Sequence, residues 1–321
     1  VAILFGIVAG AVFLIWRLVI RRTPRSSAKP ETPQPLSRQE IETRLREADE
    51  AGVDVSAAQA ELRELASRRE SGVIHLCFFG NISTGKSSLI KALVPEAEVR
   101  IDIVGGSTDD VRHFRWRNDA GVEILLTDVP GTGGPDSGYD ALALEEARRS
   151  QVVLFVCEGD LTRAEASAIA ELLALEKPMV LVMNKADRFN HDEQARLMQR
   201  LLERLEQIGG DVSRDRVVAV SAGGEVDVLT RDAEGRETLT QRQREADIGV
   251  LVVAINRLLE ADTAALDVRR DRAVFQLTAE KLAQAEAAYR TQRSEQIIRN
   301  ATRKAVIGAL WRVRRGRSSP R

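Results

Sequence analysis

A glycine-flanked loop that ends in lysine and serine carries the clearest chemistry in the sequence. It runs Gly80-Asn81-Ile82-Ser83-Thr84-Gly85-Lys86-Ser87, between the apolar segment 73–79 and a helix-like segment. The order matches G-x-x-x-x-G-K-[ST], in which glycines let backbone N–H groups point at phosphates and the helix N-terminus adds a favourable dipole. The loop predicts a nucleoside phosphate site in which Lys86 reaches the β- and γ-phosphates and Ser87 ligates Mg²⁺.

A second motif, Asn184-Lys185-Ala186-Asp187, follows the apolar run 180–183 and predicts the base. The Asp187 carboxylate can accept hydrogen bonds from N1–H and from the exocyclic amine of guanine, a donor pair that adenine lacks. The stem of Lys185 can cover the ring. We therefore expect GTP rather than ATP, and Asn184 and Asp187 argue against an ATP-dependent kinase or ATPase.

Three more segments supply groups for the metal, the γ-phosphate and the base. Asp128-Val129-Pro130-Gly131 offers a carboxylate to Mg²⁺ through water, and the Gly131 N–H is free to meet the γ-phosphate. Thr108, after Gly105-Gly106-Ser107, could bring its hydroxyl to the metal, although Ser107 competes for that role. Ser221-Ala222 offers a backbone N–H to guanine O6.

These motifs sort the candidate site residues into three groups. Nucleotide contacts are expected from Gly80, Asn81, Ser83, Thr84, Gly85, Lys86, Ser87, Ser88, Asn184, Lys185, Asp187, Ser221 and Ala222. Metal contacts are expected from Ser87, Thr108 and Asp128, and catalytic contributions from Lys86, Thr108 and Gly131.

The elements that must position these residues alternate between strands and helices. Strand-like apolar runs occupy 73–79, 123–126, 152–156, 179–183 and 217–220, and helix-like segments occupy 87–93, 139–149, 163–175, 192–208 and 248–259. This alternation predicts a doubly wound, mostly parallel α/β sheet whose ligands bind at the carboxyl ends of the strands. The phosphate loop and the motifs at 128–131, 184–187 and 221–222 each follow such a strand end, and Thr108 lies between the first two of them.

With five motifs in family order between Gly80 and Ala222, the chain resembles the GTP-binding domain of the Era-like GTPases of the translation-factor class. The resemblance implies a Ras-like fold, GTP or GDP with Mg²⁺ as ligands, and switch loops around Thr108 and Gly131. More narrowly, the chain looks like bacterial membrane-associated members with a hydrophobic helical domain after the GTPase domain. That likeness comes from the phosphate loop, the Thr108 region and the helical tail.

Two residues depart from this pattern. Thr132 follows Gly131 where Ras-like enzymes carry the glutamine that orients the attacking water. Since intrinsic hydrolysis is on the order of 10⁻⁴ s⁻¹ even with that glutamine, we expect a slow rate that a partner, dimerisation or a cation accelerates. Ser83 stands where potassium-activated Era relatives carry Asn; dynamin-like GTPases carry Ser there and also use a monovalent cation, so cation dependence is a hypothesis.

The first 36 residues predict a membrane anchor and a linker. Residues 1–20 are apolar except for Arg17, and twenty helical residues span roughly 30 Å, the hydrocarbon thickness of a bilayer. No small-residue cleavage site follows, which favours an anchor over a signal peptide. Basic residues between Arg17 and Lys29 predict that the GTPase domain lies in the cytoplasm, at the bacterial inner membrane as a single-pass protein. Residues 21–36 form a Pro-rich linker.

Helical segments flank the predicted GTP-binding domain, 71–262. Residues 37–70 form a helical hairpin that begins with a capping box of Ser37 and Glu40. The helical extension 263–321 carries an apolar stripe, Phe275, Leu282, Ala285 and Tyr289, for which self-association and intramolecular packing remain open. After residue 295 the sequence has many basic residues and no acidic ones. This pattern is typical of a segment that contacts anionic lipid or of an ordinary solvated end, and a longer hydrophobic domain could follow.

Composition excludes several other classes of function. The 321 residues, enough for about two folded units, carry 47 Lys and Arg against 48 Asp and Glu, which disfavours a globally basic nucleic-acid binder. RNA is a weaker alternative partner, because some Era relatives bind it but no G-x-x-G loop of a KH module follows Ala222. Two cysteines and three scattered histidines predict neither a disulfide framework nor a zinc site. A small hairpin over 225–241 has no assigned purpose.

Two functions therefore compete. The first is a membrane-anchored GTPase that uses the γ-phosphate to order its switch loops. The second is a nucleotide-gated membrane scaffold with negligible turnover, favoured by Thr132.

Overall fold

The computed structural model describes residues 37–94, 111–129, 141–209, 213–231, 237–261 and 263–316, all within the unit Leu36–Arg321. The predicted anchor 1–20 and linker 21–36 lie outside these ranges. Within the ranges, no helix is both long enough and apolar enough to span a bilayer.

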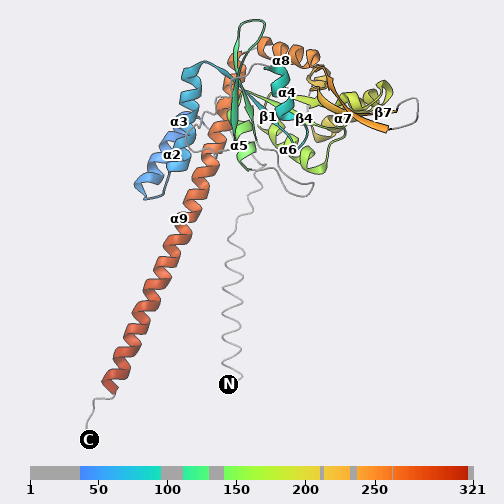
Figure 1. Cartoon of the computed structure of the whole chain (residues 1–321). Helices are drawn as coiled ribbons and strands as arrows, with labels where there is room; N and C mark the ends of the chain where they lie inside the picture. Colours follow the sequence, from blue (N-terminus) through green and yellow to red (C-terminus); the bar gives the residue numbers. More distant parts are fainter. Residues whose placement is uncertain are drawn as a thin grey trace, which may run out of the picture. The chain divides into compact units, whose positions relative to one another are not determined.

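A six-stranded sheet forms the centre of the unit, in the order β2-β3-β1-β4-β5-β6 (Figure 1). The strands are β1 (Ile74–Phe79), β2 (Arg112–Arg117), β3 (Glu123–Asp128), β4 (Val152–Cys157), β5 (Met179–Met183) and β6 (Val217–Ala219). Neighbours pair in parallel except β2, which runs antiparallel to β3. Every residue of β1, β4 and β5 is buried, as in a sheet covered on both faces. The mostly parallel α/β fold predicted from the sequence is confirmed.

Helices cover both faces of this sheet. The helices α4 (Lys86–Leu93) and α8 (Gly249–Ala261) pack with Leu154 and its face, whereas α5 (Ala141–Arg149), α6 (Arg163–Ala174) and α7 (His191–Ile208) pack with Phe155 and the opposite face. Successive strand residues point to opposite faces, so each strand contributes to both cores. Two short 3₁₀ turns, Ala186–Arg188 and Arg214–Arg216, lie beside β5 and β6.

A third core joins the two ends of the described chain. The helices α2 (Arg38–Glu50) and α3 (Ser56–Ser71) pack against α9 (Thr263–Gly316), as Figure 1 shows. Phe275 and Leu282 of α9 are buried among the side chains of α2 and α3. The Ser37–Glu40 capping box is present at the start of α2. The apolar stripe of α9 therefore packs intramolecularly, which resolves the choice that the sequence left open. From Thr291 to Lys304 every side chain of α9 is exposed.

Ion pairs attach these helices to α5. Arg149 of α5 and Lys281 of α9 both donate to Oε1 of Glu61 on α3, each at 2.6 Å, and the Glu61 side chain is 3% exposed. Arg68 of α3 pairs with Glu146 of α5 at 2.7 Å, and both side chains are buried. The helices α3, α5 and α9 thus share one buried charge network.

A two-stranded hairpin separates β6 from α8. Its strands, β7 (Gly224–Arg231) and β8 (Glu237–Arg244), pair only with each other among the described strands. The hairpin confirms the element predicted over 225–241 and extends slightly beyond it. Its root lies directly after Ser221 and Ala222, which places it next to the predicted guanine loop.

Candidate functional site

The loop between β1 and α4 depends on two glycines. Gly80 has φ +150°, and a Cβ there would lie 2.2 Å from the carbonyl oxygen of Val156. Gly85 has φ +90°, and a Cβ there would lie 2.2 Å from Nδ2 of Asn184. Only glycine fits such close approaches, so the motif glycines let the loop pack against β4 and the end of β5.

Lys86 closes this loop from inside. Its Nζ donates to the carbonyl oxygens of Gly80 and Asn81, each at 2.9 Å, and the residue is 6% exposed. Burial lowers the pKa of Lys86, while the negative charge of Asp128 acts in the opposite direction. An ammonium held over backbone carbonyls at a helix N-terminus is suited to phosphate oxygens.

The phosphate loop is also braced by residues outside the motif. Asn81 Nδ2 donates to Oε1 of Glu165 on α6 at 3.0 Å, and Thr84 Oγ1 donates to the carbonyl oxygen of Asn81 at 2.9 Å. Glu165 also completes the capping box of Thr162. The capping pattern in the sequence marks a helix start, but nothing in the sequence indicates that Glu165 reaches the loop.

Ser87 and Asp128 form the predicted metal pair. Ser87 Oγ donates to Asp128 Oδ2 at 2.5 Å, from the first turn of α4 to the end of β3. A hydroxyl and a carboxylate side by side match the oxygen ligands that Mg²⁺ prefers. The chemistry of this donor set fits Mg²⁺, which, when bound, would neutralise phosphate charge.

Asn184 ties the guanine motif to the phosphate loop. Its Nδ2 donates to the carbonyl oxygen of Thr84 at 2.8 Å, and its Oδ1 accepts from the backbone N–H of Ala222 at 3.1 Å. The Ala222 amide, expected on guanine O6, thus donates to Asn184 in this structure. Three loops that are far apart in the sequence meet at this one side chain.

Asp187 is held by donors on both carboxylate oxygens. Ser221 Oγ donates to Oδ1 at 3.0 Å, and Arg244 at the end of β8 donates to Oδ2. Lys185, in the left-handed conformation at φ +59°, donates to Oε2 of Glu158 at 2.5 Å. Neither Arg244 nor Glu158 carries a sequence signal for this site.

Of the remaining predicted site residues, some lie within the described part of the chain and others lie outside it. Ser83 has φ +65° within the loop, and Ser88 is exposed on α4. Thr108 and Gly131, and Thr132 after it, lie outside the described residues. The nucleotide and metal contacts assigned to all these residues stay predictions.

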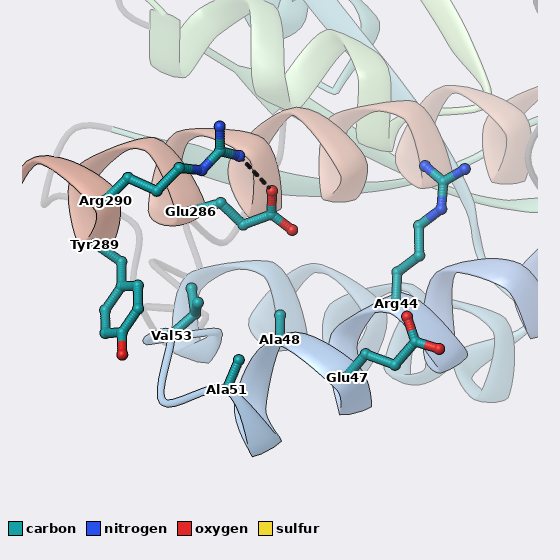
Figure 2. A pocket seen from close by; sticks show the side chains of 8 residues that line it. All are labelled: Arg44, Glu47, Ala48, Ala51, Val53, Glu286, Tyr289 and Arg290. Carbon is teal, nitrogen blue, oxygen red and sulfur yellow. Dashed lines mark hydrogen bonds and ion pairs between the residues drawn. The ribbon is translucent and has the colours of Figure 1, made fainter. Parts of the chain in front are cut away.

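A separate cavity of about 290 Å³ lies between α2 and α9 (Figure 2). Its floor is Ala48, Ala51 and Val53, and Tyr289 and Arg290 border it from α9. It shares no residue with the nucleotide motifs. Within the described chain, no cluster of three or more metal-ligating side chains was found.

In this chain one asparagine, Asn184, links the phosphate loop to the loop expected to bind guanine. Both loops lie at the carboxyl ends of parallel strands, which is the arrangement found in P-loop GTPases. The comparisons agree with this class. Residues 75–185 match the family model described as 50S ribosome-binding GTPase. The chain is 30% identical to GTPase Der of Vibrio parahaemolyticus over 119 residues, 35% of this chain and 24% of that protein.

Longer matches are more divergent. The chain is 24% identical over 270 residues to the tRNA modification GTPase MnmE of Synechococcus, which covers 77% of this chain and 58% of that protein. Among solved structures, Toc33 from Arabidopsis thaliana with Mg²⁺ and GMPPNP covers 64% of this chain and 93% of that chain, with 20% identity and a TM-score of 0.40. The chain spans only 24% to 58% of the length of the Der and MnmE proteins compared here. The matched segment, residues 75–185, therefore has the sequence pattern of a P-loop GTPase domain, a class of domain that binds guanine nucleotides.

Proposed function

We propose that the protein is an Era-like, nucleotide-dependent switch that hydrolyses GTP to GDP and phosphate at a membrane. The observation that carries this proposal is the Asn184 contact, which joins phosphate recognition to guanine recognition at one site. A switch also needs an element that follows the γ-phosphate. In the sequence, α5 is the first described helix after Asp128, and its charges pair with α3 and α9.

Membrane attachment is supported by the two ends of the sequence. The apolar residues 1–20 would anchor the protein in the bacterial inner membrane, with the GTPase domain on the cytoplasmic side. Exposed Arg299, Arg303 and Lys304 on α9 begin a segment without acidic residues that would contact anionic lipid.

Catalysis would be slow without a stimulus. Thr132 cannot orient water as glutamine does, so acceleration would come from a homodimer, an activating protein or a monovalent cation near Ser83. The cation hypothesis predicts faster turnover in KCl than in NaCl or choline chloride. Equal rates in the three salts would remove it.

Thr132 also favours the second candidate, a nucleotide-gated scaffold with negligible turnover. In that case GTP occupancy would control assembly at the membrane without needing rapid hydrolysis.

An assay of phosphate release separates the two candidate functions. It uses the chain from Ser37 onward with GTP and Mg²⁺, and it is run with and without anionic liposomes. Strong stimulation by lipid would support a membrane-activated GTPase. Tight GTP binding, measured with a fluorescent nucleotide, and no turnover in either condition would support the scaffold.

Base selection is tested independently by Asp187→Asn. The amide would exchange an acceptor for a donor, which suits xanthine in place of guanine. Preference should therefore shift from guanosine to xanthosine nucleotides. Unchanged selectivity for GTP would refute the guanine assignment.

A further inference from the structure

We propose that Arg244, at the end of the β7–β8 hairpin, positions the Asp187 carboxylate for guanine. The hairpin would thereby be part of the guanine-recognition site. This inference deepens the proposed function and rests on its assignment of Asp187 to the base.

The root of the hairpin is fixed to the guanine loop. Ser221 and Asp247 exchange two backbone hydrogen bonds, at 3.0 and 2.8 Å, across the base of the hairpin. Gly223 has φ +68°, and a Cβ there would lie 2.7 Å from the carbonyl oxygen of Arg244. The backbone of Arg244 therefore packs directly against the loop that contains Ser221 and Ala222.

The side chain of Arg244 completes the support of Asp187. Arg244 donates to Oδ2, and Ser221 Oγ donates to Oδ1 at 3.0 Å. An ionised carboxylate has about four acceptor positions, two on each oxygen. One donor on each oxygen leaves two positions, the number that N1–H and the exocyclic amine of guanine require.

Other cations close to Asp187 have a different partner. Lys185 and Arg188 both pair with Glu158 and not with Asp187. The Arg244 side chain is 48% exposed and that of Asp187 26% exposed, so the ion pair by itself contributes little to folding. Its effect is expected in the orientation of the carboxylate, and hence in base discrimination.

Inosine nucleotides measure this orientation, because hypoxanthine keeps N1–H but lacks the exocyclic amine. A carboxylate that rotates freely loses the two-bond contact with guanine more than the single bond with hypoxanthine. With one hydrogen bond contributing about 1 kcal/mol, Arg244→Gln should reduce the ratio of GDP to IDP affinity about fivefold. Arg244→Lys, which keeps a cationic donor, should restore part of that ratio.

The experiment measures GDP, IDP and ADP binding and thermal unfolding for the full chain and its variants. Arg272→Gln is the matched control, because Arg272 is also 48% exposed and pairs with Glu176, outside the nucleotide motifs. The inference is supported if only Arg244→Gln lowers the GDP to IDP ratio while both variants unfold at the wild-type temperature.

Two results would overturn it. An unchanged GDP to IDP ratio in Arg244→Gln would show that Arg244 does not act through Asp187. Tighter binding of both nucleotides would show that Arg244 obstructs the base site. Failure of the proposed function is a different result, since the wild-type chain itself would then not prefer GDP to ADP.

Discussion

The positive charge of Lys86 is buried, and burying a charge costs free energy that contact with a phosphate can offset. Its ammonium donates to two carbonyls at 2.9 Å and has further donor capacity for phosphate. Because hydrogen bonds to charged groups contribute about 1.5–3 kcal/mol each, Lys86→Ala should weaken GDP and GTP binding by about 100-fold or more. Fluorescent-nucleotide titration measures this.

Lys91 provides the control, since it is exposed on the same helix. Lys91→Ala should bind nucleotide as the wild-type chain does. Equal affinities for the Lys86 variant and the wild-type chain would contradict the phosphate-loop assignment.

Alanine variants of Gly85 and Gly121 distinguish the effect of a steric clash from the effect of backbone strain. Both have positive φ, +90° and +79°, but a Cβ would strike Asn184 only at Gly85 and meets nothing within 4 Å at Gly121. Each alanine variant should lose about 1–2 kcal/mol of stability from the left-handed backbone. Gly85→Ala should in addition lose nucleotide affinity, because Asn184 must move.

Urea unfolding and nucleotide titration of the two variants test this difference. Similar nucleotide affinity in both would show that the contact between Asn184 and the loop is dispensable.

Because His75 is buried, we expect the folded chain to lose stability in acid. Burial lowers its pKa to about 3, whereas its ordinary value is 6.5. Between these values the unfolded chain binds a proton that the folded chain does not, so stability falls as pH drops below 6.5. Glu146 adds to the loss below its ordinary 4.5, because Arg68 and Arg149, outweighing burial, lower its pKa to about 2.

His75→Asn removes the first of these contributions. The slope of unfolding free energy between about pH 6.5 and 5 should decrease by up to about 1.4 kcal/mol per pH unit. Urea unfolding across this range measures the slope. The same slope in variant and wild type would place the proton uptake elsewhere.

At the scale of elements, the charge network between α3 and α5 should behave as a buried ion pair. The Arg68 and Glu146 side chains are 6% and 5% exposed. Glu146→Gln leaves the buried Arg68 with a single carboxylate, Glu64 at 2.6 Å, so it should cost up to about 3–5 kcal/mol of stability. The double variant Arg68→Met, Glu146→Leu should recover most of it, because apolar groups need no partner.

Urea unfolding of the single and double variants forms the test. A single variant that costs less than about 1 kcal/mol would contradict the view that the pair is desolvated.

Individual elements were well predicted where their signal is local. The largely apolar runs predicted β1, β4 and β5 to within one residue, and the Ser37–Glu40 capping box marked the start of α2. The packing of α9 was not predictable in the same way. Its apolar stripe suits any apolar surface, and only the folded chain identifies α2 and α3 as that surface.

At the scale of the whole molecule, α9 has two halves with different expected roles. Its first half buries Val274, Phe275 and Leu282, whereas its side chains from Thr291 to Lys304 are exposed. Removing residues 291–321 should therefore leave the melting temperature nearly unchanged. It should also reduce sedimentation with anionic liposomes, since the basic segment is lost.

Truncation after Thr278 is the contrasting variant, because it removes buried Leu282 and the ion-pairing Lys281. It should lower the melting temperature. Unchanged liposome binding after removal of 291–321 would contradict the proposed lipid contact of α9.

The sequence alone determined the order of the nucleotide motifs and the type of sheet that carries them. Both are local: each motif lies within a few residues of one strand end, and the fully buried strands β1, β4 and β5 are apolar except for His75. Tertiary structure decided which side chains support the motifs. Glu165 meets Asn81 across 84 residues, Arg244 meets Asp187 across 57, and Lys281 meets Glu61 across 220. Such contacts depend on how packed helices and loops place side chains in space, and no spacing along the chain encodes that placement.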